Sequence, residues 1–178
     1  MNEVMSKFSL YNIFNYLVPG AALCLLIDEL GLIDLDHLDV AARLVVFYVS
    51  GMAISRAGSL LIDPMLKRAG LIPRSRFTGY VRAAAVDDKV PVLLETSNTY
   101  RTMTSACMMG LMAYVLSMTM PPAWVQHSAF GCAALALTGV LFTVSYVKQN
   151  RAVTRRVRAD ISIETADRNR TPILNVVA

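Results

Sequence analysis

Charged residues are scarce in this sequence and are missing altogether from two long stretches. Only 17% of the residues are charged and 55% are hydrophobic, which is far more apolar than an ordinary soluble domain. No charged side chain occurs between Phe8 and Ile27 or between Thr102 and Val147. Because about 20 apolar residues cross the roughly 30 Å hydrocarbon core of a bilayer, the scarcity predicts an integral membrane protein.

The motifs of catalysis and of metal binding are also missing. The sequence has no phosphate-binding Gly-rich loop, nucleophile elbow, HExxH motif or paired cysteines. The three cysteines, Cys24, Cys107 and Cys132, fall within apolar stretches, where a thiol serves as a small packing residue. We therefore expect neither an enzyme nor a bound cofactor or metal.

What the sequence does contain is a set of four apolar stretches, each predicted to form a membrane-spanning helix. Their approximate bounds are residues 8–30, 40–62, 102–120 and 128–147. We predict an all-α polytopic membrane protein in which residues 1–178 form a single membrane domain. A short helical loop, residues 65–101, and a basic helical tail, residues 148–178, complete it.

Lysine and arginine are concentrated in that loop and that tail. The connection after the first span has no basic residue before Arg43 and is acidic, with Asp28, Glu29, Asp34, Asp36 and Asp39. Positive residues are retained on the cytoplasmic side during insertion. We therefore expect the loop, the tail and both termini to be cytoplasmic.

Small residues recur where helices are expected to pack. Gly51, Ser55 and Ser59 are spaced four residues apart in the second span, and Gly131 and Gly139 lie in the fourth. In lipid, such positions let two helix backbones approach closely. The pattern predicts helix contacts within one chain or between copies, and we expect a homo-oligomer.

Pro19 and Gly20 interrupt the first span. Proline removes a backbone donor and clashes with the preceding helical turn. The pair predicts either a tolerated kink or a hinge or pore-lining break.

Arg56 is a charged residue inside the second apolar stretch, before an Asp63-Pro64 pair that is expected to end the helix. A charge deep in a bilayer is costly and needs a partner, a wet cavity or a route to the interface. Three alternatives follow. Arg56 extends to the cytoplasmic headgroups, pairs with Asp63 or Glu95, or lines an ion or ligand pathway.

A second polar group precedes the third span. Glu95, Asn98 and Arg101, together with Tyr100, are expected to organise the cytoplasmic mouth of the protein. The alternative is an ordinary hydrated helix end.

The tail carries cations around an apolar stripe. Val153, Val157 and Ile161 recur every four residues, and the cations are Lys148, Arg151, Arg155, Arg156 and Arg158. Such a helix binds anionic membrane lipid, or it docks its stripe on the cytoplasmic loop or on a protein partner. Nucleic-acid binding is the least favoured alternative, because no recognition module is present.

Three motifs carry a resemblance that covers most of the chain: Tyr11-x-x-Phe14-x-x-x-Val18-Pro19-Gly20, Ile54-Ser55-Arg56-x-Gly58-Ser59-Leu60 and Glu95-Thr96-x-Asn98-x-Tyr100-Arg101-Thr102. In these the chain resembles a group of small, largely uncharacterised four-span bacterial inner-membrane proteins. Its layout is similar to that of accessory membrane proteins of CRISPR loci and of the membrane component of Kiwa-type anti-phage systems.

The resemblance implies a membrane anchor, effector or sensor of a bacterial defence-type system, whose cytoplasmic face meets a soluble partner. Two other functions stay open: a small ion channel or transporter, and a structural subunit of a larger membrane complex. A channel should show a continuous polar stripe through several spans, and here only Arg56, Ser55, Ser59 and a few threonines qualify.

Overall fold

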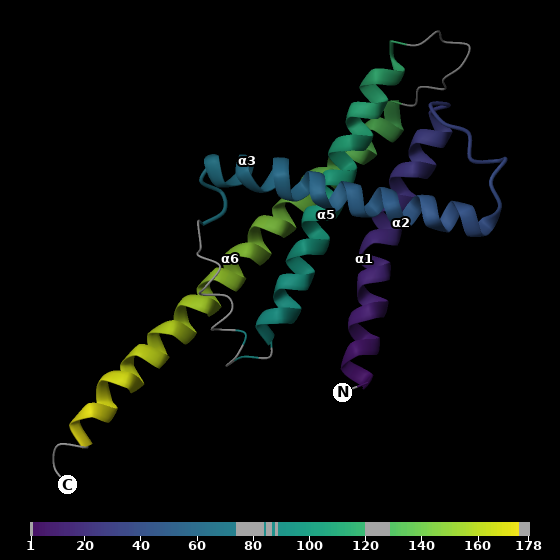
Figure 1. Ribbon diagram of the computed structural model, residues 1–178. Coiled ribbons are helices and arrows are strands. Elements are labelled where there is room, and N and C mark those ends of the chain that lie inside the picture. Colours follow the sequence, from purple (N-terminus) through teal and green to yellow (C-terminus); the bar gives the residue numbers. More distant parts are fainter. Residues whose placement is uncertain (1, 74–83, 85–86, 88, 120–128, 175–178) are drawn as a thin grey trace.

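The computed structural model describes residues 2–73, 84, 87, 89–119 and 129–174 (Figure 1), with side chains at all of these except 2–12, 14, 129 and 160–174. Its elements are α1 (Asn2–Glu29), α2 (Val40–Ala57), a π-helical turn η1 (Gly58–Ile62), α3 (Asp63–Arg68), α5 (Lys89–Ser117) and α6 (Ala129–Leu174). Throughout this part of the chain there are helices and connections but no strand. The predicted all-α class is confirmed.

Residues suited to starting or ending a helix stand at several helix ends. Gly31 follows the end of α1 with a φ of 67°, and Gly70 follows α3 with a φ of 70°, a backbone conformation that glycine adopts without steric cost. Before α2, the carboxylate of Asp39 accepts a hydrogen bond from the Ala42 amide at 2.7 Å. Such a cap satisfies an amide that has no partner within the helix.

The prediction that Asp63-Pro64 ends the second helix is wrong. α2, η1 and α3 form one rod from Val40 to Arg68, and Pro64 lies in the first turn of α3. The Asp63 amide bonds the Gly58 carbonyl five residues back, which makes the turn wider than in an α-helix. The wider turn accommodates Pro64, which has no N–H and whose ring would clash in an ordinary helical turn.

Two of the described helices are long and apolar enough to cross a membrane: the rod Val40–Arg68 and residues Phe130–Ala159 of α6. Only 6% of the most apolar stretch of α6 and 28% of that of the rod are buried within the chain. A core helix of a soluble protein is mostly covered, whereas most of both stretches is exposed in this chain. Helices also stand at the first and third predicted spans, as α1 and α5. Neither is among the two helices found long and apolar enough to cross a membrane.

The elements do not stand side by side as four parallel spans. Figure 1 shows the rod of α2, η1 and α3 running across α1, α5 and α6 rather than alongside them. The start of α1 and the end of α6 lie toward one end of the view, and the connection between α1 and α2 lies toward the other.

Close backbone contact holds α1 against α2. A Cβ at Gly20 would lie 1.8 Å from the Phe47 carbonyl oxygen, and a Cβ at Gly51 would lie 1.8 Å from the Tyr16 carbonyl oxygen. Only glycine fits at both positions, because even a methyl group would overlap the opposite backbone. Pro19 is fully buried and lies within the helical residues of α1. The Pro19-Gly20 pair therefore lies at a helix crossing.

Apolar side chains extend this contact to α5 and α6. Leu23 of α1, Ile54 of α2 and Ala106 of α5 form one buried cluster. Leu30 and Tyr114 form a second, with Cys132 of α6 packed against it. These clusters join residues far apart in the sequence, so the four long helices of the described chain form one packed body.

Candidate functional site

A polar cluster lies where α3, α5 and α6 meet, and we define it as Asp63, Lys67, Arg101 and Tyr146. The Tyr146 hydroxyl donates to Oδ1 of Asp63, and Nζ of Lys67 lies 3.1 Å from Oδ2 of the same carboxylate. Tyr146 is 2% exposed, and the Asp63 side chain is 19% exposed. A carboxylate can be sheltered in this way because each of its oxygens has a hydrogen-bonding partner.

Arg101 brings a second cation to the polar cluster. Its guanidinium interacts with the Tyr146 hydroxyl, while its own Nε is buried without a hydrogen-bond partner. With one carboxylate and two cations among its four residues, the polar cluster has an excess of positive side chains. Asp63 and Arg101, which the sequence assigned to separate groups, thus both contact Tyr146.

Hydroxyl groups line α5 beside the polar cluster. Thr102, Thr104 and Ser105 are buried, and each donates to the backbone carbonyl four residues earlier, at 2.9–3.1 Å. Such bonds let a polar side chain lie in an apolar setting without another partner. The hydroxyls of Thr102 and Ser55 also lie 3.3 Å apart, which joins α5 to α2 by a polar contact.

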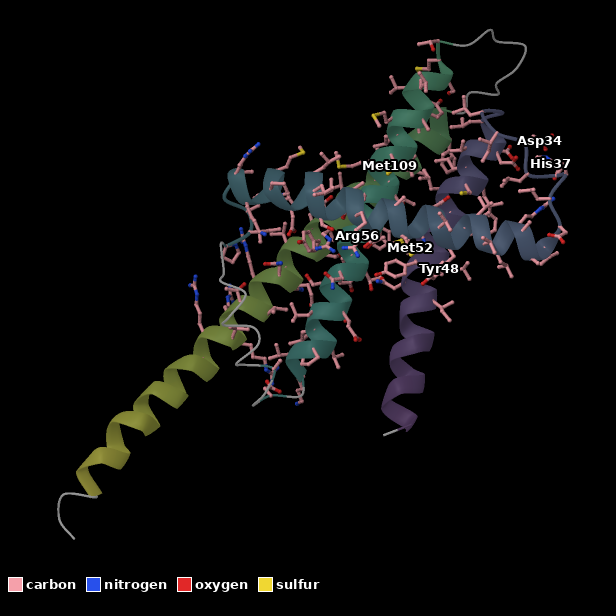
Figure 2. All side chains as sticks on the ribbon, in the orientation of Figure 1. Asp34, His37, Tyr48, Met52, Arg56 and Met109 are labelled. Atoms are coloured by element: carbon pink, nitrogen blue, oxygen red, sulfur yellow. The ribbon has the colours of Figure 1, made fainter. Side chains whose placement is uncertain are left out.

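Arg56 does not reach this cluster. Figure 2 shows Tyr48, Met52 and Arg56 in succession along α2, and Arg56 is exposed. Asp63, its proposed partner, is instead bonded to Lys67 and Tyr146. Within the described residues Arg56 forms no ion pair, an arrangement that leaves its side chain free to extend.

Two further members of the predicted cytoplasmic mouth, Glu95 and Asn98, lie on the first part of α5. Glu95 is half-buried and Asn98 is exposed. The carbonyl oxygens of both accept hydroxyl groups one turn later, from Thr99 and Thr102 respectively. Of the predicted group, Arg101 alone belongs to the polar cluster.

The small residues lie in three different environments. Gly51 and Ser55 are buried between helices of the same chain, whereas the Ser59 hydroxyl bonds the Ser55 carbonyl of its own helix at 2.9 Å. A Cβ at Gly139 would lie 3.1 Å from Cβ of Cys107 on α5, and Gly131 is exposed. The second-span pattern is thus used for contacts within one chain.

The tail docks on its own chain through what we term the C-terminal seam: Val90, Val153 and Val157. These three side chains are at most 4% exposed, and Leu93 and Leu94 pack against them. Burial of this size stabilises the docked helix by about 1.5–3 kcal/mol for each fully buried side chain. The docking alternative for the tail stripe therefore holds as far as Val157, and the Ile161 side chain lies outside the described residues.

Two tail cations bond other parts of the chain. Nε of Arg156 lies 2.6 Å from Oδ2 of Asp87, and Nε of Arg151 donates to the Leu71 carbonyl at 3.0 Å. The amide of Lys89, and after it the Arg156 guanidinium, holds the pKa of Asp87 below its usual value. Lys148, Arg155 and Arg158 are exposed.

Sequence reasoning missed Tyr146, Lys67 and the hydroxyls of α5. Thr102 and Ser105 are spaced three residues apart, which places them on one helix face, and that spacing was a usable signal. Tyr146 gave none, because its partner Asp63 is 83 positions away. No group of three or more His, Cys, Asp or Glu side chains able to hold a metal occurs among the described residues.

Comparison of this chain with protein-family models, with curated proteins and with solved structures finds no match.

Proposed function

We propose that this chain is a non-enzymatic integral membrane protein of the bacterial inner membrane, which anchors a cytoplasmic assembly there and transmits its state to the bilayer. The observation that carries the proposal is the continuity of α6 from Ala129 to Leu174. At 1.5 Å per residue its 46 residues extend about 69 Å, whereas the hydrocarbon core is roughly 30 Å thick. A single helix therefore reaches from the bilayer into the aqueous phase.

The exposed surface supports insertion of α6. Phe130, Leu137, Val140 and Leu141 are 84%, 73%, 61% and 63% exposed, which is costly in water and favourable against acyl chains. Charged residues begin at Lys148 and continue down the helix. A helix that is apolar over its first half and cationic over its second fits an end on the cytoplasmic side.

The four-span arrangement with both termini cytoplasmic is part of the proposal. The apolar part of α5, residues 102–117, is about 24 Å long, and its hydroxyls bond their own helix, which removes the cost of burying them in lipid. The rod from Val40 to Arg68 is about 43 Å long, enough to cross the core at a steep tilt. The acidic connection 30–39 would then face the outer side.

The resemblance to defence-associated proteins supplies the biological setting, in which a cytoplasmic partner meets the tail that the C-terminal seam positions, and copies of the chain associate in the membrane. The test challenges bacteria with phage while they carry the chain and its native genomic neighbours, either as wild type or as Val157→Asp. We expect wild type to lower plaque counts and the seam variant to lose this effect while remaining in the membrane.

Two results would contradict the proposal in different ways. If wild type leaves plaque counts unchanged, the proposed role in defence is wrong, and the proposal that the chain is a membrane anchor stands. If alkaline carbonate releases the wild-type protein from membranes, the proposal that the chain is a membrane anchor is wrong.

A small channel is the second candidate function, and the polar cluster favours it. A carboxylate, two cations and a buried tyrosine gather where the apolar half of α6 ends, and charges within or at the end of membrane helices often mark ion pathways. Membrane depolarisation on expression of wild type, lost in Arg101→Gln but kept in the exposed variant Arg56→Gln, would support a channel. Unchanged potential in all three at equal membrane levels would exclude autonomous conduction.

A further inference from the structure

A groove runs along α6 at the point where its apolar half meets its cationic half. Leu71, Val144 and Val147 contribute apolar walls, and Lys148, Arg151 and Arg155 contribute cations. Its volume is about 580 Å³, within the range of sites that hold organic ligands. The groove lies on a different face of α6 from Tyr146, Val153 and Val157, so it belongs to neither the polar cluster nor the C-terminal seam.

The cations of the groove are available to a ligand. Lys148, Arg151 and Arg155 lie three, four and seven positions apart, which aligns them on one helix face over about 10 Å. Lys148 and Arg155 form no ion pair with any described residue. Arg151 bonds the Leu71 carbonyl through Nε alone, leaving its other N–H groups to donate. That bond also fixes the guanidinium beside the groove.

The position of the groove determines what its occupant is made of. Val147 is the last residue of the uncharged run that begins at Thr102, and Lys148 is the first cation after it. The groove therefore spans the boundary at which the proposed membrane helix leaves the bilayer. An occupant needs an anionic end toward Lys148, Arg151 and Arg155 and an apolar end toward Val144 and Val147.

We propose that this groove is a binding site for an anionic phospholipid of the cytoplasmic leaflet. Its phosphate accepts hydrogen bonds from Arg151 and lies between Lys148 and Arg155, while an acyl chain lies along Val144 and Val147. A guanidinium matches two oxygens of a phosphate, and basic pockets beside membrane helices favour anionic headgroups. This site rests on the proposed function, because it requires α6 to lie in the membrane.

The test uses the full-length protein, purified in detergent and titrated with equal amounts of phosphatidylglycerol and phosphatidylcholine of matched acyl chains. Native mass spectrometry counts the lipids bound. The variant Lys148→Gln/Arg155→Gln removes two cations from the groove. Its matched control, Arg68→Gln/Lys89→Gln, removes two exposed cations that lie outside the groove.

We expect wild type to prefer phosphatidylglycerol, and the groove variant to bind it about 25-fold more weakly, since each cation near a membrane surface contributes about fivefold. The control should keep wild-type binding. Equal losses in the two variants, or no preference in wild type, would overturn the site. Displacement of the lipid by millimolar inorganic phosphate would show a site for free anions instead.

A second measurement distinguishes failure of the lipid site from failure of the proposed function. Each variant is also tested for extraction from membranes by alkaline carbonate. A protein that stays in the membrane without a preference for phosphatidylglycerol overturns the lipid site alone. A protein that carbonate releases overturns the membrane assignment on which the site rests.

Discussion

The hydroxyl of Tyr146 on α6 donates to the carboxylate of Asp63 at the start of α3, across 83 positions of sequence. The contact connects the helix proposed to leave the membrane with the rod that crosses the other helices. It also covers the Asp63 carboxylate, which is 19% exposed and has Lys67 as its ion-pair partner, while Arg101 contacts the same hydroxyl. The polar cluster thus contributes both to the packing of three helices and to their electrostatics.

Tyr146→Phe should destabilise the protein by about 1–3 kcal/mol, the usual cost of leaving a buried acceptor without its donor. Thermal unfolding in detergent measures the change. Tyr48→Phe is the matched control: Tyr48 is half-buried and packs edge to face on Tyr16. Equal melting temperatures for the two variants would show that the contact between Tyr146 and Asp63 contributes nothing.

Gly51→Ala should disrupt the crossing of α1 and α2. Its Cβ would overlap the Tyr16 carbonyl, and the overlap involves backbone that cannot rotate away, so the cost should be at least about 1–3 kcal/mol. Gly139→Ala meets only the Cβ of Cys107 at 3.1 Å and should cost less. Size-exclusion profiles and melting temperatures of both variants check the order, and the reverse order would contradict the crossing.

Val157→Ala should loosen the C-terminal seam without unfolding the rest. Loss of two methyl groups from a 4% exposed side chain costs about 1–3 kcal/mol by transfer and cavity terms. Limited trypsin digestion should then cleave the tail roughly tenfold faster or more. Val140→Ala, at a 61% exposed position, should cleave as wild type does. A wild-type cleavage rate for Val157→Ala would contradict docking of the tail.

Acid should weaken the contact between Asp87 and Arg156. The folded pKa of Asp87 is lowered from 3.8, first by the Lys89 amide. Its stabilisation is therefore present in full above about pH 4 and is lost as pH falls through the folded pKa. Hydrogen exchange of residues 149–159, corrected for intrinsic rates, should accelerate below pH 4. Asp87→Asn should abolish that acceleration, and an unchanged profile in the variant would assign it to other groups.

Helix positions could be predicted from the sequence because they follow from apolar length. The continuation of α6 beyond Val147 follows from the stripe of Val153 and Val157, which lie four residues apart. The crossing of the rod could not be predicted, because it depends on two glycines in different helices, Gly20 and Gly51, each fitted to the other backbone.

Only some residues of the polar cluster could be singled out from the sequence, because its contacts also depend on how the helices cross. Charge in an apolar stretch singled out Arg56 and Asp63, since such residues are conspicuous in sequence. Which of the two side chains is buried depends on the direction in which its face of the helix points. The π-helical turn between them rotates that face. The partners of Asp63 come from α6 and from its own helix, and no local pattern indicates Tyr146.

The most direct test of the central claim, a membrane helix continuous with a cytoplasmic tail, is the topology of the intact chain in bacteria. Green fluorescent protein, which becomes fluorescent in the cytoplasm, and alkaline phosphatase, which becomes active outside it, are fused after Ala178 or inserted between Asp34 and His37. The account predicts a fluorescent C-terminal fusion and an active phosphatase in the 34–37 connection, with both proteins resistant to carbonate extraction. Active phosphatase after Ala178, or release of the wild-type chain by carbonate, would contradict it.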